Sequence, residues 1–177
     1  MRFTQLLLRW LPTFLMFPLG GLIATMALGP ISDLLSAAVS GAIVGALIGL
    51  VQWWALRPIG TSFDWVWATA VSLMVASPLA WTVIDYNTTI SNLTIWGLIT
   101  GLIVGFSQAA SQRKSNSARF SWSVLVSIAW GGAWFISANV IVDAGSNYAI
   151  FGSTGALTAT LFLSLFINRL LAKQERS

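Results

Sequence analysis

Six long apolar stretches, separated by short polar connections, run through this chain. A helix needs about 20 mostly apolar residues to cross a bilayer. The stretches that meet this condition are roughly residues 11–28, 34–56, 65–84, 90–110, 120–142 and 148–170. Because lipid offers no hydrogen-bond partners, each stretch must satisfy its own backbone groups and is expected to be helical. The apolar runs do not alternate, which argues against a transmembrane β-barrel. The sequence therefore predicts one all-α transmembrane domain of six helices over residues 1–177.

Composition agrees with this class and excludes several functions. The chain is 56% hydrophobic and 8% charged, too few charges to cover a water-facing surface. It contains neither Cys nor His, which rules out thiol and His catalysis, disulfides, the usual zinc sites and His-ligated haem. The cations are scattered, so no nucleic-acid partner is expected. We predict no catalytic residue, no metal ligand and no enzymatic activity. No cofactor is predicted, and a bound lipid or pigment is left open.

The positions of the cations predict the orientation. Every Lys and Arg falls on one side of the six predicted helices, before the first, after the second, after the fourth or after the sixth. The opposite side carries only carboxylates, namely Asp33, Asp85 and Asp143. Because positive loops stay inside, both termini are predicted to be cytoplasmic. The expected location is the prokaryotic inner membrane, or the thylakoid membrane if the source is cyanobacterial.

A five-residue pattern occurs twice, 56 positions apart. Its first copy is Gly41, Gly45, Gly49, Gln52 and Arg57, and its second is Gly97, Gly101, Gly105, Gln108 and Arg113. Arg169 lies another 56 positions on. The pattern predicts three repeated helical hairpins, approximately 5–57, 62–113 and 118–170, with a degenerate third copy. The intervening helices match less well, and Trp65 and Trp67 resemble Phe120 and Trp122 at an offset of 55.

The repeated residues have a physical interpretation. At about 100° per residue the three glycines and the glutamine of each copy share one helix face. Small residues let helices approach closely in lipid, and polar side chains add hydrogen bonds, as in GxxxG packing. These faces are predicted to be helix–helix seams, either within the chain or toward a partner or a flat lipophilic ligand. Gln52 and Gln108 are expected to bond a backbone carbonyl or a Ser or Thr, with ligand contact as the alternative. Arg57, Arg113 and Arg169 are predicted lipid-headgroup anchors.

The chain has ten tryptophans. Those near the ends of the predicted helices suit aromatic belts at the two interfaces. The inner belt would contain Trp10, Trp53, Trp54, Trp65, Trp67 and Trp122, with Trp81 in the outer one. Trp96, Trp130 and Trp134 lie deeper and are expected to be packing residues rather than a ligand cage.

The stretches from Gly41 to Arg57 and from Gly97 to Arg113 resemble the tandem hairpins of uncharacterised bacterial and cyanobacterial multi-pass membrane proteins. Those proteins carry repeated Gly-rich helices that end in Gln-Trp and Leu-Arg, and here Gln108 lacks the following Trp. The resemblance implies a prokaryotic membrane protein and no established activity.

The sequence is rich in residues that suit helix packing and has no recognisable catalytic groups. This combination favours a non-enzymatic accessory or assembly subunit. Such a subunit would sit in the lipid bilayer and pack through its glycine faces against a larger respiratory or photosynthetic membrane complex. The alternative is a small-solute or lipophilic-ligand carrier or transporter component. That alternative requires a polar pocket at mid-depth, for which the candidates are Asn139, Thr100, Thr158 and Thr160.

Overall fold

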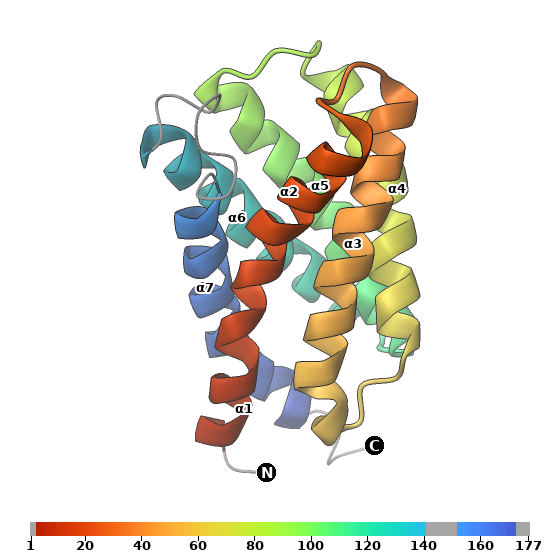
Figure 1. The fold of residues 1–177 in the computed structure, drawn as a ribbon. Coiled ribbons are helices and arrows are strands. Elements are labelled where there is room, and N and C mark those ends of the chain that lie inside the picture. Colours follow the sequence, from red (N-terminus) through yellow and green to blue (C-terminus); the bar gives the residue numbers. More distant parts are fainter. Residues whose placement is uncertain (1–2, 141–151, 173–177) are drawn as a thin grey trace.

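The computed structural model describes residues 3–140 and 152–172, and every regular element within them is helical. The helices pack side by side into a bundle and run roughly along its long direction (Figure 1). The α-helices are α1 (Phe3–Trp10), α2 (Met16–Leu28), α3 (Leu34–Leu56), α4 (Asp64–Val83), α5 (Ile90–Ser111), α6 (Asn116–Val140) and α7 (Ser153–Ala172). Two 3₁₀ turns, η1 (Leu11–Leu15) and η2 (Arg57–Ile59), follow α1 and α3.

Five of the described segments are long and apolar enough to cross a membrane. They are Phe3–Leu28, Leu34–Ile59, Asp64–Val83, Ile90–Ser111 and Asn116–Asn139. The described apolar part of α7, Ser153–Ile167, is shorter, and the predicted start of that span at residue 148 lies outside the described residues. The chain is therefore a helical, multi-pass membrane protein, with five segments of spanning length in the part that the structure describes.

Local chemistry explains where the helices begin and end. The Asp33 carboxylate accepts from the Ser36 backbone N–H at 2.7 Å, and the Ser36 hydroxyl accepts from the Asp33 N–H at 3.0 Å. This capping box stabilises the start of α3. Gly29 and Gly60 adopt positive φ angles of 77° and 90°, which allow the chain to turn after a helix.

The first span differs from its prediction. It begins at Phe3 rather than near residue 11, because Leu6 and Trp10 of α1 are buried in the bundle. Pro12 lies in the 3₁₀ turn η1, where it cannot donate a backbone hydrogen bond to a continuous helix. The span is consequently divided into α1 and α2.

Each helix packs against the next along the chain, from α2 to α7. α7 also contacts α1, η1 and α2, so the first and last spans lie side by side and close the bundle (Figure 1).

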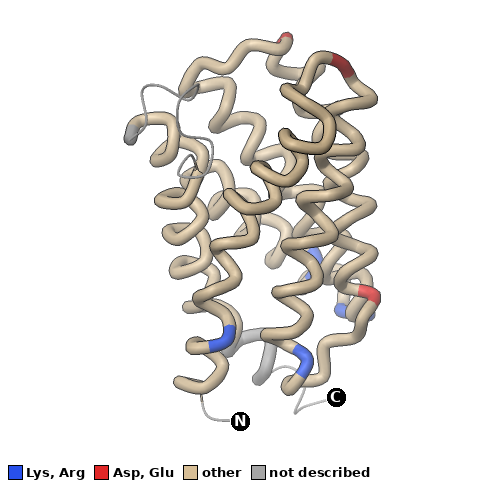
Figure 2. The backbone as a smooth tube through the Cα atoms, viewed as in Figure 1, with Lys and Arg blue, Asp and Glu red and all other residues tan. Residues whose placement is uncertain are grey.

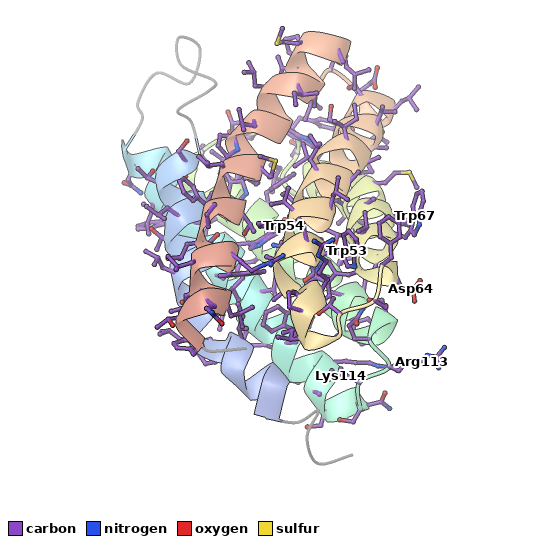
Figure 3. All side chains as sticks on the ribbon, turned by 60° about the horizontal axis from the view of Figure 1, so that its bottom comes forward. Trp53, Trp54, Asp64, Trp67, Arg113 and Lys114 are labelled. Atoms are coloured by element: carbon purple, nitrogen blue, oxygen red, sulfur yellow. The ribbon has the colours of Figure 1, made fainter. Side chains whose placement is uncertain are left out.

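Charge is distributed unequally along the bundle. The described Lys and Arg residues gather at the end where α1 begins and α7 ends, whereas carboxylates lie at both ends (Figure 2). With that end turned forward, the bundle carries Trp53, Trp54, Trp67, Asp64, Arg113 and Lys114 on the half toward this end (Figure 3). Trp54 and Trp67 are exposed, as belt residues would be. The predicted inner belt is wrong for Trp10, Trp65 and Trp122, which are buried because their indole groups make hydrogen bonds inside the bundle.

Candidate functional site

The glycine faces lie against neighbouring helices of the same chain. A Cβ atom added at Gly45 would lie 2.7 Å from the Thr69 carbonyl oxygen of α4, and one at Gly101 would lie 2.7 Å from the Val126 carbonyl oxygen of α6. A Cβ atom added at any of the four flanking glycines would also contact the covering helix closely. On α4 the contacted residues are Leu73 for Gly41, and Val66 and Thr69 for Gly49. On α6 they are Trp130 for Gly97, and Trp122, Ser123 and Val126 for Gly105. Backbones can approach this closely only where a side chain is absent. Both faces are thus covered by the chain's own helices.

The two seams have the same contacts, but the spacing between equivalent residues differs by one position between the glycine helices and the helices that cover them. The repeat found in the sequence did not predict this difference. Gly45 and Gly101 are 56 positions apart, but their opposite residues, Thr69 and Val126, are 57 apart. The offset of 55 between Trp65 and Phe120 therefore does not pair equivalent positions. The connection between the glycine face and its covering helix is one residue longer in the second copy. Each seam also joins helices from two different expected hairpins, α3 with α4 and α5 with α6, so the hairpin repeat itself stays a prediction.

A hydrogen-bonded polar cluster lies between these seams. The side-chain oxygen of Gln52 accepts from Trp65 Nε1 at 3.2 Å and from Gln108 Nε2 at 3.1 Å. The side-chain oxygen of Gln108 accepts from Trp122 Nε1 at 3.2 Å, and Gln108 Nε2 also donates to Thr69 Oγ1 at 3.0 Å. An indole N–H is only a donor, so the two tryptophans fix which end of each amide is oxygen. The Thr69 contact is of the kind expected from the sequence, whereas the glutamine–glutamine contact and the indole donors are not.

Two cavities lie between the helices of the bundle. The inner cavity, of about 50 Å³, is lined by residues of α1, η1, α2, α3, α6 and α7, among them Gln52 of α3. The outer cavity, of about 190 Å³, is lined by α2 to α6 toward the end that is poor in Lys and Arg. Phe17 and Trp134 line both, and their rings meet edge to face with centroids 5.6 Å apart. This aromatic pair forms part of the wall between the cavities.

The outer cavity is mostly apolar, and two of the tryptophans that line it carry an indole N–H without an acceptor in the described part of the chain. Trp81 and Trp96 both line it, and their indole nitrogens are buried with no acceptor among the described residues. Trp96 packs edge to face on Trp134 at 5.1 Å, and Trp81 stacks on Tyr86 at 6.1 Å. A buried donor without an acceptor loses its hydrogen bond to water without recovering one. An acceptor that reached either nitrogen would restore the missing hydrogen bond.

The sequence located part of this site. Of the four residues proposed for a polar pocket, Thr160 lines the inner cavity. Thr100, Thr158 and Asn139 instead donate to backbone carbonyls of their own helices, at 2.8, 2.9 and 2.7 Å. Trp96 and Trp134 were expected only to pack. No sequence signal distinguished a tryptophan with an acceptor from one without.

The predicted headgroup anchors lie apart from the cavities. The Arg57 guanidinium carbon lies 5.7 Å from the centroid of the Trp53 ring. Arg113 is exposed just after α5 and has a φ angle of 54°, while the side chain of Arg169 is outside the described residues. Arg9, which was not predicted, lies 4.2 Å above the Trp54 ring and donates to the Trp54 carbonyl oxygen at 2.6 Å. Arg9 thereby joins α1 to the last turns of α3.

Comparison of the chain with protein-family models, curated proteins and solved structures found no match.

Proposed function

We propose that this chain binds a neutral lipophilic ligand in its outer cavity, as a carrier or transporter component. One observation carries the proposal: Trp81 and Trp96 place two buried indole nitrogens without acceptors beside a single apolar cavity. A buried donor left without a partner costs about 1–3 kcal/mol. A ligand that accepts from one or both of these groups would recover much of that cost.

The cavity also supports a class of ligand. Its volume of about 190 Å³ exceeds the roughly 150 Å³ of an apolar cavity that binds benzene. A ring-sized head group therefore fits. No charged side chain is among its lining residues, which favours a neutral head group bearing carbonyl, ether or hydroxyl oxygen.

The test compares retained ligand among matched variants. The protein is purified from its source membrane in mild detergent, and the extracted lipophiles are identified by mass spectrometry. The wild type is expected to retain a neutral oxygen-bearing lipophile. The double substitution Trp81→Phe and Trp96→Phe is expected to lower retention about tenfold, the equivalent of about 1.4 kcal/mol.

The control is Trp67→Phe, which removes an indole N–H from a residue that is 64% exposed on the surface. This variant should retain as much ligand as the wild type. Equal retention by the folded double variant, or the absence of any enriched lipophile in the wild type, would contradict the proposal.

The accessory-subunit role stays a prediction of the sequence. Since α4 and α6 cover the glycine faces, a partner helix would have to dock on another part of this chain. The particle mass in the same purification tests this role, because a stable complex would exceed the mass of the chain and its detergent.

For topology, we propose six spans, with both termini in the cytoplasm of a prokaryotic cell. The gathering of described Lys and Arg residues at one end supports this orientation. A reporter active only in the cytoplasm should work when fused after Ser177 and fail when fused after Asn87, in the α4–α5 connection. The reverse pattern would contradict the orientation.

A further inference from the structure

The inner cavity differs from the outer one in the polarity of its lining. Four polar side chains line it, Thr13, Gln52, Ser137 and Thr160, from four separate elements. We infer that this cavity is a second binding site, which holds one or two water-sized neutral molecules carrying an acceptor oxygen.

The orientation of Gln52 carries the inference. Its side-chain oxygen already accepts from Trp65 and from Gln108 on the side of α4 and α5. Because the Trp65 indole can only donate, the amide cannot be turned around without placing two donors against each other. Among the described residues, no acceptor takes the side-chain N–H groups of Gln52, and Gln52 borders the cavity. The hydrogen-bonded cluster therefore ends in donors at the inner cavity.

Gln108 provides the contrast within the same cluster. Its nitrogen donates to both Gln52 and Thr69, its oxygen accepts from Trp122, and its side chain is 2% exposed. The two glutamines occupy equivalent positions in the repeated pattern, but of the two only Gln52 has side-chain N–H groups without an acceptor among the described residues. A molecule in the inner cavity would complete its hydrogen bonds.

The size and charge of the cavity limit its occupant. A water molecule occupies about 30 Å³ in the liquid and needs two to four polar partners. The cavity of about 50 Å³ offers the Gln52 amide and three hydroxyl groups that can each donate or accept. No charged side chain lines it, so an ion would lie in the low-dielectric interior without a counter-charge. A neutral occupant of one to a few heavy atoms is favoured.

This site does not depend on the function proposed for the outer cavity. The Phe17–Trp134 pair lies between the two, and neither Trp81 nor Trp96 lines the inner cavity. Loss of ligand binding in the Trp81 and Trp96 variants would leave the inner site unchanged.

The experiment observes the glutamine side chains directly. The full chain, labelled with ¹⁵N only at glutamine, is placed in lipid nanodiscs and studied by NMR. The Gln52 amide is assigned from its contact with the Trp65 indole proton and from the loss of its signal in Gln52→Leu. Its protons are expected to show cross-peaks to long-lived water, and those of Gln108 are expected to show none.

Methanol serves as a second probe, to distinguish water from a small solute. Cross-peaks to water that methanol does not disturb would identify water as the occupant. A saturable shift of the Gln52 signal by methanol would identify a small hydroxyl-bearing solute. Thr160→Val should weaken either signal by at least about twofold, because it removes one of the few polar partners. A folded protein whose Gln52 amide responds to neither probe would overturn the inference.

Discussion

Gln108 donates its side-chain N–H to the side-chain oxygen of Gln52, at 3.1 Å and across 56 positions of sequence. The two residues hold the same place in the repeated pattern, so the two glycine-faced helices meet at equivalent side chains. Each glutamine also receives an indole N–H from the helix that covers its own glycine face. The cluster therefore links α3, α4, α5 and α6 through side-chain hydrogen bonds.

Replacing Gln108 with Leu should destabilise the fold. The substitution leaves the Trp122 indole without its acceptor and removes the donor to Gln52 and Thr69. We expect a loss of about 1–3 kcal/mol in the free energy of unfolding, measured by reversible unfolding in mixed micelles. Thr100→Val is the matched control, because that buried hydroxyl donates to carbonyls of its own helix. If Gln108→Leu is no more destabilising than the control, the cluster does not stabilise the fold.

Replacing Gly45 with Ala should separate α3 from α4. The new Cβ would lie 2.7 Å from the Thr69 carbonyl oxygen and 2.9 Å from the Ala70 Cα, both backbone atoms that cannot rotate away. We expect a destabilisation of about 1–3 kcal/mol, as for other overpacked sites. Gly21→Ala in α2 is the control, since a Cβ there meets nothing within 4 Å. Equal melting temperatures for the two variants would show that the close approach is not required.

Trp10→Phe should loosen the contact between the first and last spans. The Trp10 indole is 1% exposed and donates to the Thr160 carbonyl oxygen at 3.0 Å. Loss of this bond and of part of the ring should cost about 1–3 kcal/mol. Trp67→Phe, on the exposed surface, should leave the unfolding free energy unchanged within about 0.5 kcal/mol. A Trp10→Phe protein as stable as the Trp67→Phe protein would refute the prediction.

Acid should weaken the start of α3. The backbone N–H of Ser36, followed by its hydroxyl, lowers the pKa of the Asp33 carboxyl below its ordinary value. A lowered folded-state pKa means that the stabilisation is present above the ordinary Asp value of about 3.9 and is lost as the pH falls below it. Asp33→Asn caps the helix without titrating.

The measurement is the melting temperature of both proteins from about pH 7 to about pH 3. Any advantage of the wild type over Asp33→Asn should shrink only in the acidic part of this range. A difference between the two proteins that does not change with pH would contradict the proposed titration of the cap.

The sequence predicted the helices well, because their boundaries depend on local chemistry. α3 spans Leu34–Leu56, as predicted, and α5 spans Ile90–Ser111, within one residue of its prediction. The length of the apolar stretches was sufficient to predict both helices. The start of the first span was predicted about eight residues too late, because burial of Leu6 depends on helices distant in the sequence.

The candidate site was less predictable. Gln52 and Gln108 could be singled out as polar groups in apolar helices, but their mutual contact depends on how α3 and α5 are placed around α4. The same is true of Trp81 and Trp96. That their indole N–H groups lack acceptors can be recognised only from the positions of all the surrounding residues. Helical periodicity specifies the face of a residue but not the partner across that face.

The 3₁₀ turn Leu11–Leu15 divides the first span just where it passes the inner cavity, which Thr13 and Phe14 line. Close contact at glycines holds α3 to α4, α5 to α6 and α7 to α6, where a Cβ at Gly155 would clash with the Ala133 carbonyl oxygen. In contrast, α2 meets α3 at ordinary distance, with a Cβ at Gly20 lying 3.4 Å from Val44 Cα. A short 3₁₀ segment within a longer helix often marks a hinge. We therefore expect the first span to be the part that moves to admit molecules to the inner cavity, with α2 rotating about Leu11–Leu15 while α3 to α7 keep their packing.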